Sequence, residues 1–158
     1  MFGAGPRLKE VVQLRIQDVD LHARTLKLRK GKGNKWRVTI LPESLVAPMQ
    51  EQIQFCRDLW EQDRASRVNP VKLPEGVERK FPNGGEEFEW FWLLPSERLA
   101  RCTGYRDRWH YHRGAFGNAL RAARRKAAIG KRITAHVLRH SFATASLMNG
   151  LDIYRLSK

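Results

Sequence analysis

Residues 135–144, AHVLRHSFAT, carry the strongest signal in this chain. The stretch predicts a helix over about Thr134 to Asn149, in which His136 and Arg139 stand three residues apart and share one face. A histidine can transfer a proton, and an arginine is a fixed cationic fork that suits a phosphate oxygen. A histidine and an arginine on a helix surface also occur without any site, so the rest of the sequence must decide between the two interpretations.

The composition favours a nucleic-acid partner. The 158 residues include 30 Lys and Arg against 16 Asp and Glu, a net charge of +14, and such an excess of cations is typical of nucleic-acid binders. With 42% hydrophobic residues, the chain is expected to form one domain with its own core. It contains no apolar run long enough for a membrane span and no signal-peptide core near Met1, which predicts a soluble, cytoplasmic protein.

The two cysteines, Cys56 and Cys102, have no C-x-x-C spacing and no His-rich surroundings. We interpret them as reduced thiols in the core or at the surface. The sequence therefore predicts no disulfide framework, no metal site and no cofactor.

The basic residues gather in two stretches. Residues 24–37 hold seven cations and no acid, and residues 101–139 hold eleven cations with Asp107 as the single acid. Neutralising phosphates releases counterions, so DNA binding is expected to depend strongly on salt. The cations from these stretches that we expect at the DNA are Arg29, Lys30, Arg37, Arg121, Arg124 and Arg125.

Hydrophobic spacing predicts a mainly α-helical fold with a small β-hairpin or antiparallel sheet (α+β). Alternating β-prone residues on both sides of the glycine-rich run 30–35 predict the hairpin, with Lys32 at or near its tip. The expected elements are helices over residues 6–17, 43–67, 112–129 and 134–149, and strands over residues 25–29 and 37–41. Residues 69–85 are expected to form a loop, and residues 88–94 a short helix or a strand.

Two of these helices have apolar residues at helical spacing, which predicts the side chains that face the core. These side chains are Leu45, Met49, Ile53 and Leu59 in the helix over 43–67, and Phe116, Leu120, Ala123 and Ala127 in the helix over 112–129.

Three separated segments, taken in order, resemble the motifs of one family. The segments are Gly3-Ala4-Gly5-Pro6-Arg7-Leu8-Lys9-Glu10, Gly31-Lys32-Gly33-Asn34-Lys35-Trp36-Arg37 and His136-Val137-Leu138-Arg139-His140. They resemble the G-x-G-L-R-x-x-E, G-K-G-x-K-x-R and H-x-L-R-H boxes of the tyrosine recombinases, or phage integrases. Within residues 69–95, the segments 77–83 and 87–92 resemble the extra insertion of the integron integrases. The chain is thus similar to a tyrosine recombinase catalytic domain, and most of all to an integron integrase.

The resemblance implies a phosphate clamp. Arg7 and Arg139 would hold the scissile phosphate and stabilise the charge that builds on its non-bridging oxygens. Glu10 would hold an arginine or a histidine in place, and its alternative is an ordinary carboxylate on a helix surface. Pro6 stands where the family has leucine, a departure that could shift the backbone that positions Arg7.

The resemblance also assigns the proton transfers. Lys32 would protonate the departing 5′ oxygen, and Lys35 is the rival candidate because it flanks the same turn. The alternative for Lys32 is a nonspecific phosphate contact. His136 would assist proton transfer.

The family's nucleophile has no counterpart at the matching place in these residues. The reaction needs a tyrosine that attacks phosphorus and forms a 3′ phosphotyrosyl link, and the family carries it, after an L-G-H segment, well beyond the box arginine. Tyr105, Tyr111 and Tyr154 stand elsewhere and are expected to stack or pack. We therefore expect a partial catalytic domain, without its nucleophile segment and without the helical DNA-binding domain that precedes it in the family. Such a fragment would bind DNA without cleaving it.

The consecutive aromatic residues Trp90, Phe91 and Trp92 cannot all face one core, so at least one is expected to be exposed. The resemblance implies that Trp90 and Trp92, with His110 and His112 nearby, contact extrahelical bases of a folded single-stranded recombination site. The alternative is that these aromatic side chains pack the insertion against the domain.

Two functions remain open. The chain is either a DNA-binding fragment of a site-specific recombinase or a basic accessory or regulatory module without recombinase activity. DNA, as a duplex or as a folded single strand, is the expected partner of both. Apolar surface that further helices would cover is expected to favour association between copies.

Overall fold

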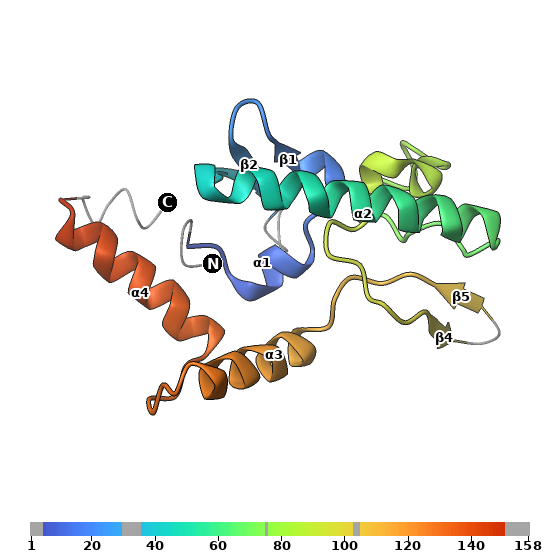
Figure 1. Cartoon of the computed structure of the whole chain (residues 1–158). Helices are drawn as coiled ribbons and strands as arrows, with labels where there is room; N and C mark the ends of the chain where they lie inside the picture. Colours follow the sequence, from blue (N-terminus) through green and yellow to red (C-terminus); the bar gives the residue numbers. More distant parts are fainter. Residues whose placement is uncertain (1–4, 30–35, 75, 103–104, 151–158) are drawn as a thin grey trace.

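The computed structural model describes residues 5–29, 36–74, 76–102 and 105–150 (Figure 1). They form a mixed α and β fold with small antiparallel sheets, which confirms the predicted α+β class. The predictions for Lys30, Lys32 and Lys35 concern residues outside the described ranges. In chain order the elements are α1 (Leu8–Val12), η1 (Ile16–Asp18), β1 (Val19–Asp20), β2 (Thr25–Arg29), β3 (Trp36–Ile40), η2 (Glu43–Leu45), α2 (Val46–Ala65), η3 (Gly84–Glu86), η4 (Phe88–Trp90), β4 (Ala100–Cys102), β5 (Tyr105–Asp107), α3 (Arg113–Lys126) and α4 (Ala135–Met148).

The larger sheet has the strand order β1-β2-β3 and is antiparallel throughout. Along β2, Leu26 and Leu28 are buried and Lys27 between them is exposed, because successive strand residues point to opposite faces. The register places Leu28 opposite Arg37 and Lys27 opposite Val38. The predicted hairpin strands are confirmed, whereas the two-residue strand β1 is too short for a sequence pattern to indicate.

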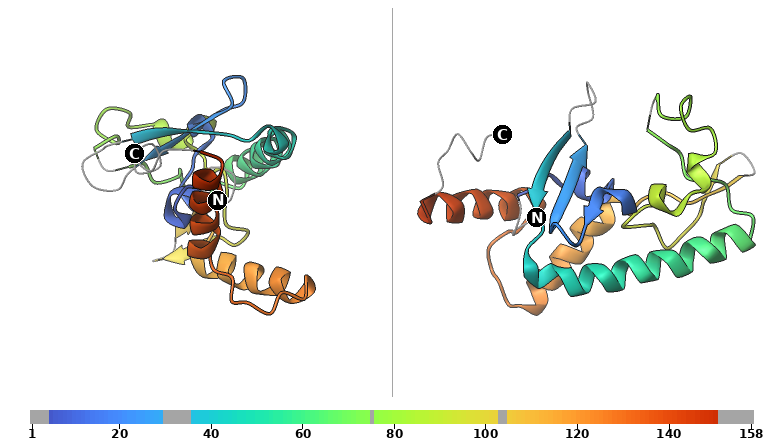
Figure 2. Two further views of the ribbon diagram at one scale, coloured as in Figure 1. Left: turned by 90° about the vertical axis from the view of Figure 1, so that its left-hand side faces the viewer. Right: turned by 90° about the horizontal axis from the view of Figure 1, so that it is seen from above.

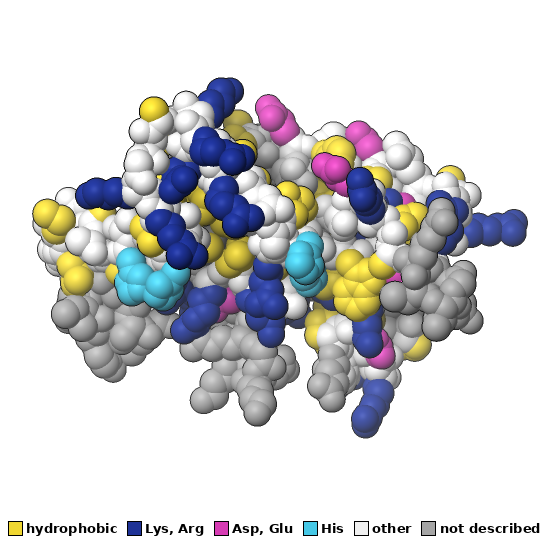
Figure 3. Space-filling model, turned by 90° about the horizontal axis from the view of Figure 1, so that it is seen from below, with side chains coloured by type: hydrophobic (Ala, Val, Ile, Leu, Met, Phe, Trp, Pro, Cys, Tyr) yellow, Lys and Arg dark blue, Asp and Glu magenta, His cyan; other side chains and the backbone are white. Residues whose placement is uncertain are grey.

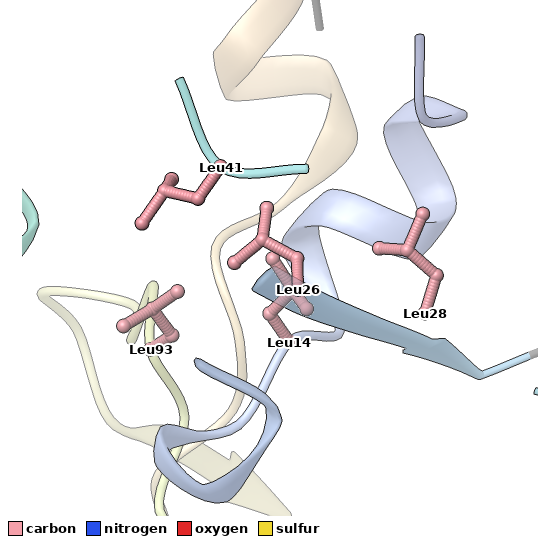
Figure 4. Close-up of a cluster of buried hydrophobic side chains, with 5 residues drawn as sticks. All are labelled: Leu14, Leu26, Leu28, Leu41 and Leu93. Carbon is pink, nitrogen blue, oxygen red and sulfur yellow. The ribbon is translucent and has the colours of Figure 1, made fainter. Parts of the chain in front are cut away.

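Two clusters of buried side chains form the core. Five leucines from the α1–β1 segment, β2, the residue after β3 and the segment after η4 make the first, which Figure 4 shows: Leu14, Leu26, Leu28, Leu41 and Leu93. The second consists of Cys56, Val71, Phe88, Phe91 and Trp92. The long helix α2 begins beside the sheet and extends well past it (Figure 2), and its Ile53 packs against both clusters.

The first helix is much shorter than predicted. A helix over residues 6–17 was expected, but α1 ends at Val12. The chain then extends so that the Ile16 N–H donates to the Phe91 carbonyl (3.1 Å) and the Leu93 N–H donates to the Leu14 carbonyl (2.9 Å). These bonds to a distant segment replace the bonds that a longer helix would have made.

The predicted core positions of α2 are correct in part. Met49, Ile53 and Leu59 are partly buried and pack against the core clusters. Leu45 is 43% exposed, so its prediction was wrong. It belongs to the short 3-10 turn η2, which precedes α2 and has a different helical phase.

The predicted core positions of α3 are also correct in part. Phe116 and Leu120 are partly buried, whereas Ala123 and Ala127 are exposed, so the prediction for the two alanines was wrong. Helix α3 packs against α1 with its first half, and its last turns extend away from that helix (Figure 1). The spacing of apolar residues along α3 does not show how far α1 extends over this helix.

A second antiparallel pair, β4 with β5, was not predicted. The chain beyond it is joined to α2 by a buried ion pair between Arg108 and Asp63. The Arg108 Nη2 lies 2.6 Å from Asp63 Oδ1, and its Nε donates to Oδ2 at 2.8 Å. Both side chains are at most 6% exposed, so this two-bond contact replaces the water that each charge has lost.

Candidate phosphate-binding site

Three arginines from separate elements gather around Glu10. Arg7 is the N-cap of α1, Glu10 lies in its first turn, Arg37 comes from β3 and Arg139 from α4. The Arg7 backbone N–H donates to Glu10 Oε2 (2.7 Å), and its Nη1 lies 3.2 Å from Oε1. The Arg37 Nη2 donates to Glu10 Oε2 at 3.0 Å. One carboxylate therefore holds two guanidinium groups in a fixed relation.

Glu10 is ionised in this cluster. Its side chain is 7% exposed, and burial alone would raise its pKa. The bond from the Arg7 N–H and the positive charges of Arg37 and Arg7 outweigh that effect, so the pKa lies below its ordinary value of 4.5. Three arginines then face one negative charge, and the cluster carries an excess of positive charge. The Arg7 side chain is 60% exposed, which leaves this excess open to solvent.

Arg139 joins α4 to the segment before α1. Its Nη1 donates to the Gly5 carbonyl. Burial and the positive charges of Arg7 and Arg37 lower the pKa of Arg139, against the opposing effect of Glu10. A bound anion would relieve this repulsion between cations. The cluster therefore has the composition and the charge of an oxyanion site.

His136 and His140 form a pair on the exposed side of α4. Their Nε2 atoms lie 2.6 Å apart, and their rings meet edge to face with centroids 4.1 Å apart. At this distance one Nε2 can donate only if the other accepts, so the tautomers of His136 and His140 depend on each other. The sequence interpretation quoted His140 in the motif but gave it no role, although its spacing of four residues from His136 places both on one face.

The cations at the base of the hairpin are engaged within the fold. The Arg29 guanidinium binds Asp18, with Nε 2.9 Å and Nη2 2.8 Å from Oδ1, and it also lies over the Trp90 ring, 5.2 Å from its centroid. Arg37 binds Glu10. Both residues were expected at DNA, and the structure gives each a carboxylate partner. The sequence interpretation gave Asp18 no role as a partner of a cation.

Arg15 was also missed. It is 4% exposed and lies against Trp92, with its guanidinium carbon 3.9 Å from the ring centroid. Its Nη1 donates to the Trp90 carbonyl (2.5 Å), and its Nη2 donates to the Lys72 carbonyl (2.7 Å). Burial and the charge of Arg29 lower the pKa of Arg15 to about 10, against the effect of Asp18. Arg15 thus fixes the segment around residues 69–95 to the rest of the fold.

The consecutive aromatic residues are packed, and the expectation of an exposed one was wrong. Phe91 and Trp92 are 2% and 5% exposed, and Trp90 is partly buried. The turn η4 ends at Trp90, after which the backbone extends and both following side chains enter the core. The Trp92 indole N–H donates to the Arg108 carbonyl (3.0 Å). Packing, the alternative left open, therefore describes Trp92, which has no ring face to offer to a base.

The two histidines expected near DNA have local roles. His110 meets the Trp92 ring edge to face, with centroids 5.1 Å apart, and its Nδ1 lies 3.0 Å from the Tyr111 carbonyl oxygen. His112 is the N-cap of α3, where its Nδ1 accepts from the Gly114 N–H. His112 is exposed and His110 is half-buried.

Helix α3 adds cations to the same side of the molecule. Arg121 and Arg125 are exposed and four residues apart on one helix face, whereas Arg124 is half-buried and donates to the Lys131 carbonyl (3.4 Å). Figure 3, which views the molecule from the side of α3 and α4, shows Lys and Arg side chains spread over this face and few acidic ones. The face is therefore suited to a polyanion.

Two further findings concern only the described part of the chain. No helix there is long and apolar enough to cross a membrane. No three or more His, Cys, Asp and Glu side chains gather there as a metal site would require.

Comparison with known proteins identifies the family. Residues 1–158 match the model of the phage integrase family. An "Integrase/recombinase" of Escherichia coli is 39% identical over 155 residues, which cover 97% of this chain and 46% of that protein. The tyrosine recombinase XerD of Agrobacterium fabrum is 28% identical over 97% of this chain and 40% of its own. The chain belongs to the phage integrase family, whose members are the tyrosine recombinases.

Solved structures agree with this assignment. The crystal structure of XerA recombinase superimposes with a TM-score of 0.67 at 26% identity, over 98% of this chain and 44% of that one. The Tn1549 transposon integrase, in complex with transposon right end DNA, shares the fold with a TM-score of 0.59 at 17% identity. The chain spans about half the length of these relatives.

Proposed function

We propose that this chain is the DNA-binding, phosphate-clamping part of a site-specific recombinase of the integron integrase kind. The arrangement of Arg7, Arg37 and Arg139 around Glu10 supports the proposal most strongly. These cations come from three elements far apart in the sequence, and together they exceed the charge of the one carboxylate. Such a fixed cluster can hold a phosphate oxygen before and during charge build-up, without having to reorganise.

The proposed roles follow from this arrangement. Arg7 and Arg139 bind the non-bridging oxygens of one DNA phosphate, and Glu10 keeps Arg7 and Arg37 in place. Lys32, with Lys35 as its rival, protonates the 5′ oxygen. His136 assists proton transfer, and its contact with His140 sets which ring nitrogen carries the proton.

Cations outside the cluster fix the position of the DNA. Arg121 and Arg125 are placed to contact neighbouring phosphates, and Arg124 and Lys30 are proposed to assist them. Such contacts add affinity without reading sequence. The sequence signal for them was the excess of cations in the two basic stretches.

The integron-like part of the proposal rests on Phe81 and on Trp90, the last residue of η4. Phe81 is 53% exposed, and its ring lies 6.5 Å from that of Trp90, centroid to centroid. An extrahelical base could stack on this aromatic pair. In this proposal Trp90 and Phe81 contact the base. Trp92 cannot do so, because it is buried.

We further propose that residues 1–158, tested alone, bind DNA without forming a covalent link. None of Tyr105, Tyr111 and Tyr154 stands where the family's motif order places the nucleophile. The test incubates the chain with labelled integron-site DNA, both as a duplex and as a folded single strand, on native and denaturing gels in parallel. A salt-sensitive native shift without a denaturation-resistant adduct is expected. An adduct would refute the proposal, because one of the three tyrosines would then be a nucleophile.

The second candidate function is a general DNA-binding accessory module, favoured by the cations spread over the face of α3 and α4 (Figure 3). The variants Arg7→Gln and Arg139→Gln separate the two functions. A phosphate clamp should lose affinity chiefly for recombination-site DNA. A general binder should lose a little affinity for every sequence.

A further inference from the structure

The outer face of the larger sheet exposes apolar side chains that the proposed function does not use. Along β3, Trp36 is 60% exposed, Val38 53% and Ile40 72%. They occupy alternate positions of one strand and therefore share one face. The strand is at the end of the order β1-β2-β3, so this face is accessible at an edge of the sheet.

The side chain of Lys27 lies next to the exposed indole of Trp36. Lys27 of β2 lies opposite Val38 in the register, and its Nζ lies over the Trp36 ring, 4.7 Å from the centroid. Neither β2 nor β3 contains an acidic residue. The face thus combines an aromatic ring, an apolar strip and positive charge, which suits a ligand with a flat apolar part and a negative one.

The same strand connects this face to the arginine cluster. Arg37 stands between Trp36 and Val38 but points to the opposite side of the sheet, where it binds Glu10. A phosphate held by the cluster and a base lying against Trp36 would therefore meet two sides of one edge strand. A base paired inside a duplex has no free face to offer, whereas an unpaired base can swing round the edge.

We propose that the outer face of β3 binds an unpaired DNA base, which stacks on Trp36 while Lys27 binds its phosphate. The inference rests on the proposed function in one respect, namely that DNA is the ligand. Aromatic rings bind unpaired bases in this way with little dependence on sequence. The absence of acids from both strands and the net charge of +14 favour a nucleic acid over a second copy of this chain, which would carry the same charge.

The test measures the affinity of the whole chain for a short oligothymidylate and for a fully paired duplex, by fluorescence anisotropy. Trp36→Ala should weaken oligothymidylate binding about 5- to 100-fold and leave duplex binding unchanged. Trp36→Phe, which keeps a stacking ring, should retain most of the affinity. The matched control is Trp109→Ala, which removes another exposed tryptophan (41%) from outside this sheet and should change neither affinity.

Three results would overturn the inference. If Trp36→Ala bound oligothymidylate and duplex as tightly as the parent does, Trp36 would not be a base site. The proposed function would not be affected. Equal losses for both ligands would show that Trp36 acts through the fold, and Lys27→Gln would check this in a chain that keeps the indole. Sedimentation showing a dimer for the parent chain and a monomer for Trp36→Ala would make the face an interface between copies. Failure of every variant and of the parent to bind any DNA would instead refute the proposed function.

Discussion

Gly5 is the position where one added methyl group should disturb the arginine cluster most. Its φ of +62° lies in the left-handed region, which side chains other than glycine rarely adopt. A Cβ at this position would lie 2.6 Å from Cδ1 and 2.7 Å from Cε1 of the Phe142 ring. Phe142 of α4 can approach this closely because Gly5 has no side chain. The Gly5 carbonyl also accepts from Arg139 of the same helix, so both contacts of α4 with this residue would be disturbed.

The expected cost of Gly5→Ala combines two effects. The left-handed conformation costs an alanine about 1–2 kcal/mol, and crowding against a packed ring costs about 1–3 kcal/mol. The free energy of unfolding should therefore fall by about 2–5 kcal/mol, towards the lower end because the half-buried Phe142 ring can shift. Urea denaturation followed by circular dichroism measures this change. The affinity for DNA should fall as well, because Arg139 loses its anchor.

Gly117→Ala is the matched control. Gly117 lies inside α3, and a Cβ there would have no neighbour within 4 Å. The same substitution should therefore raise the free energy of unfolding by about 0.5–1 kcal/mol, since alanine favours a helix. A Gly5→Ala chain as stable as the parent would refute the argument from the close approach of α4.

Three other predictions concern charges and a thiol. Asp63→Ala should lower the free energy of unfolding by about 3–5 kcal/mol in urea denaturation, because it leaves Arg108 buried without its partner. In a Cys102→Ser chain, Cys56 should react far more slowly with a thiol reagent at pH 8 in the native state than in urea, because burial raises the pKa of its thiol to about 11. The folded pKa of Glu10 lies below 4.5, so its stabilising contribution is present above that pH and is lost as the pH falls through the folded pKa. The difference in unfolding free energy between the parent and Glu10→Gln should therefore shrink below about pH 4.5, as denaturation at a series of pH values can measure.

Each of these has an opposing outcome. If the Asp63→Ala chain were as stable as the parent, the ion pair between Asp63 and Arg108 would contribute nothing to the free energy of unfolding. Equal thiol reaction rates in the folded and unfolded chains would contradict the burial of Cys56. A difference for Glu10→Gln that grows as the pH falls would reverse the direction of its pKa shift.

Local sequence patterns were sufficient for the hairpin and for the helix α4. Alternating residues and a glycine-rich turn define β2 without reference to the rest of the chain, and the observed strand Thr25–Arg29 agrees with the prediction. The helix predicted over residues 134–149 is observed as Ala135–Met148, with Thr134 as the N-cap whose side chain accepts from the Val137 N–H. The signals for both elements lie within a few residues of one another.

What the sequence could not show depends on distant partners. Trp92 is buried because Arg15 and Arg108 come from elsewhere in the chain to meet it. Asp18 and Asp63 look like surface acids until their arginines are located in space. The motif residues Arg7 and Arg139 could be identified by resemblance, but the fold was needed to show that Arg7 and Arg37 share the Glu10 carboxylate and that Arg139 binds the Gly5 carbonyl beside them.

The central claim is that Arg7, Arg37 and Arg139 form one site for a DNA phosphate. The most direct test is the dependence of DNA affinity on salt for the parent, Arg7→Gln and Arg139→Gln, with Arg98→Gln as the control. Arg98 is an exposed cation just before β4, which lies at the opposite end of the molecule from α4 (Figures 1 and 2). Each cluster variant should bind more weakly and reduce the slope of log affinity against log salt by about 1, while the control keeps the parental affinity for site DNA. Parental slopes in both cluster variants would contradict the claim.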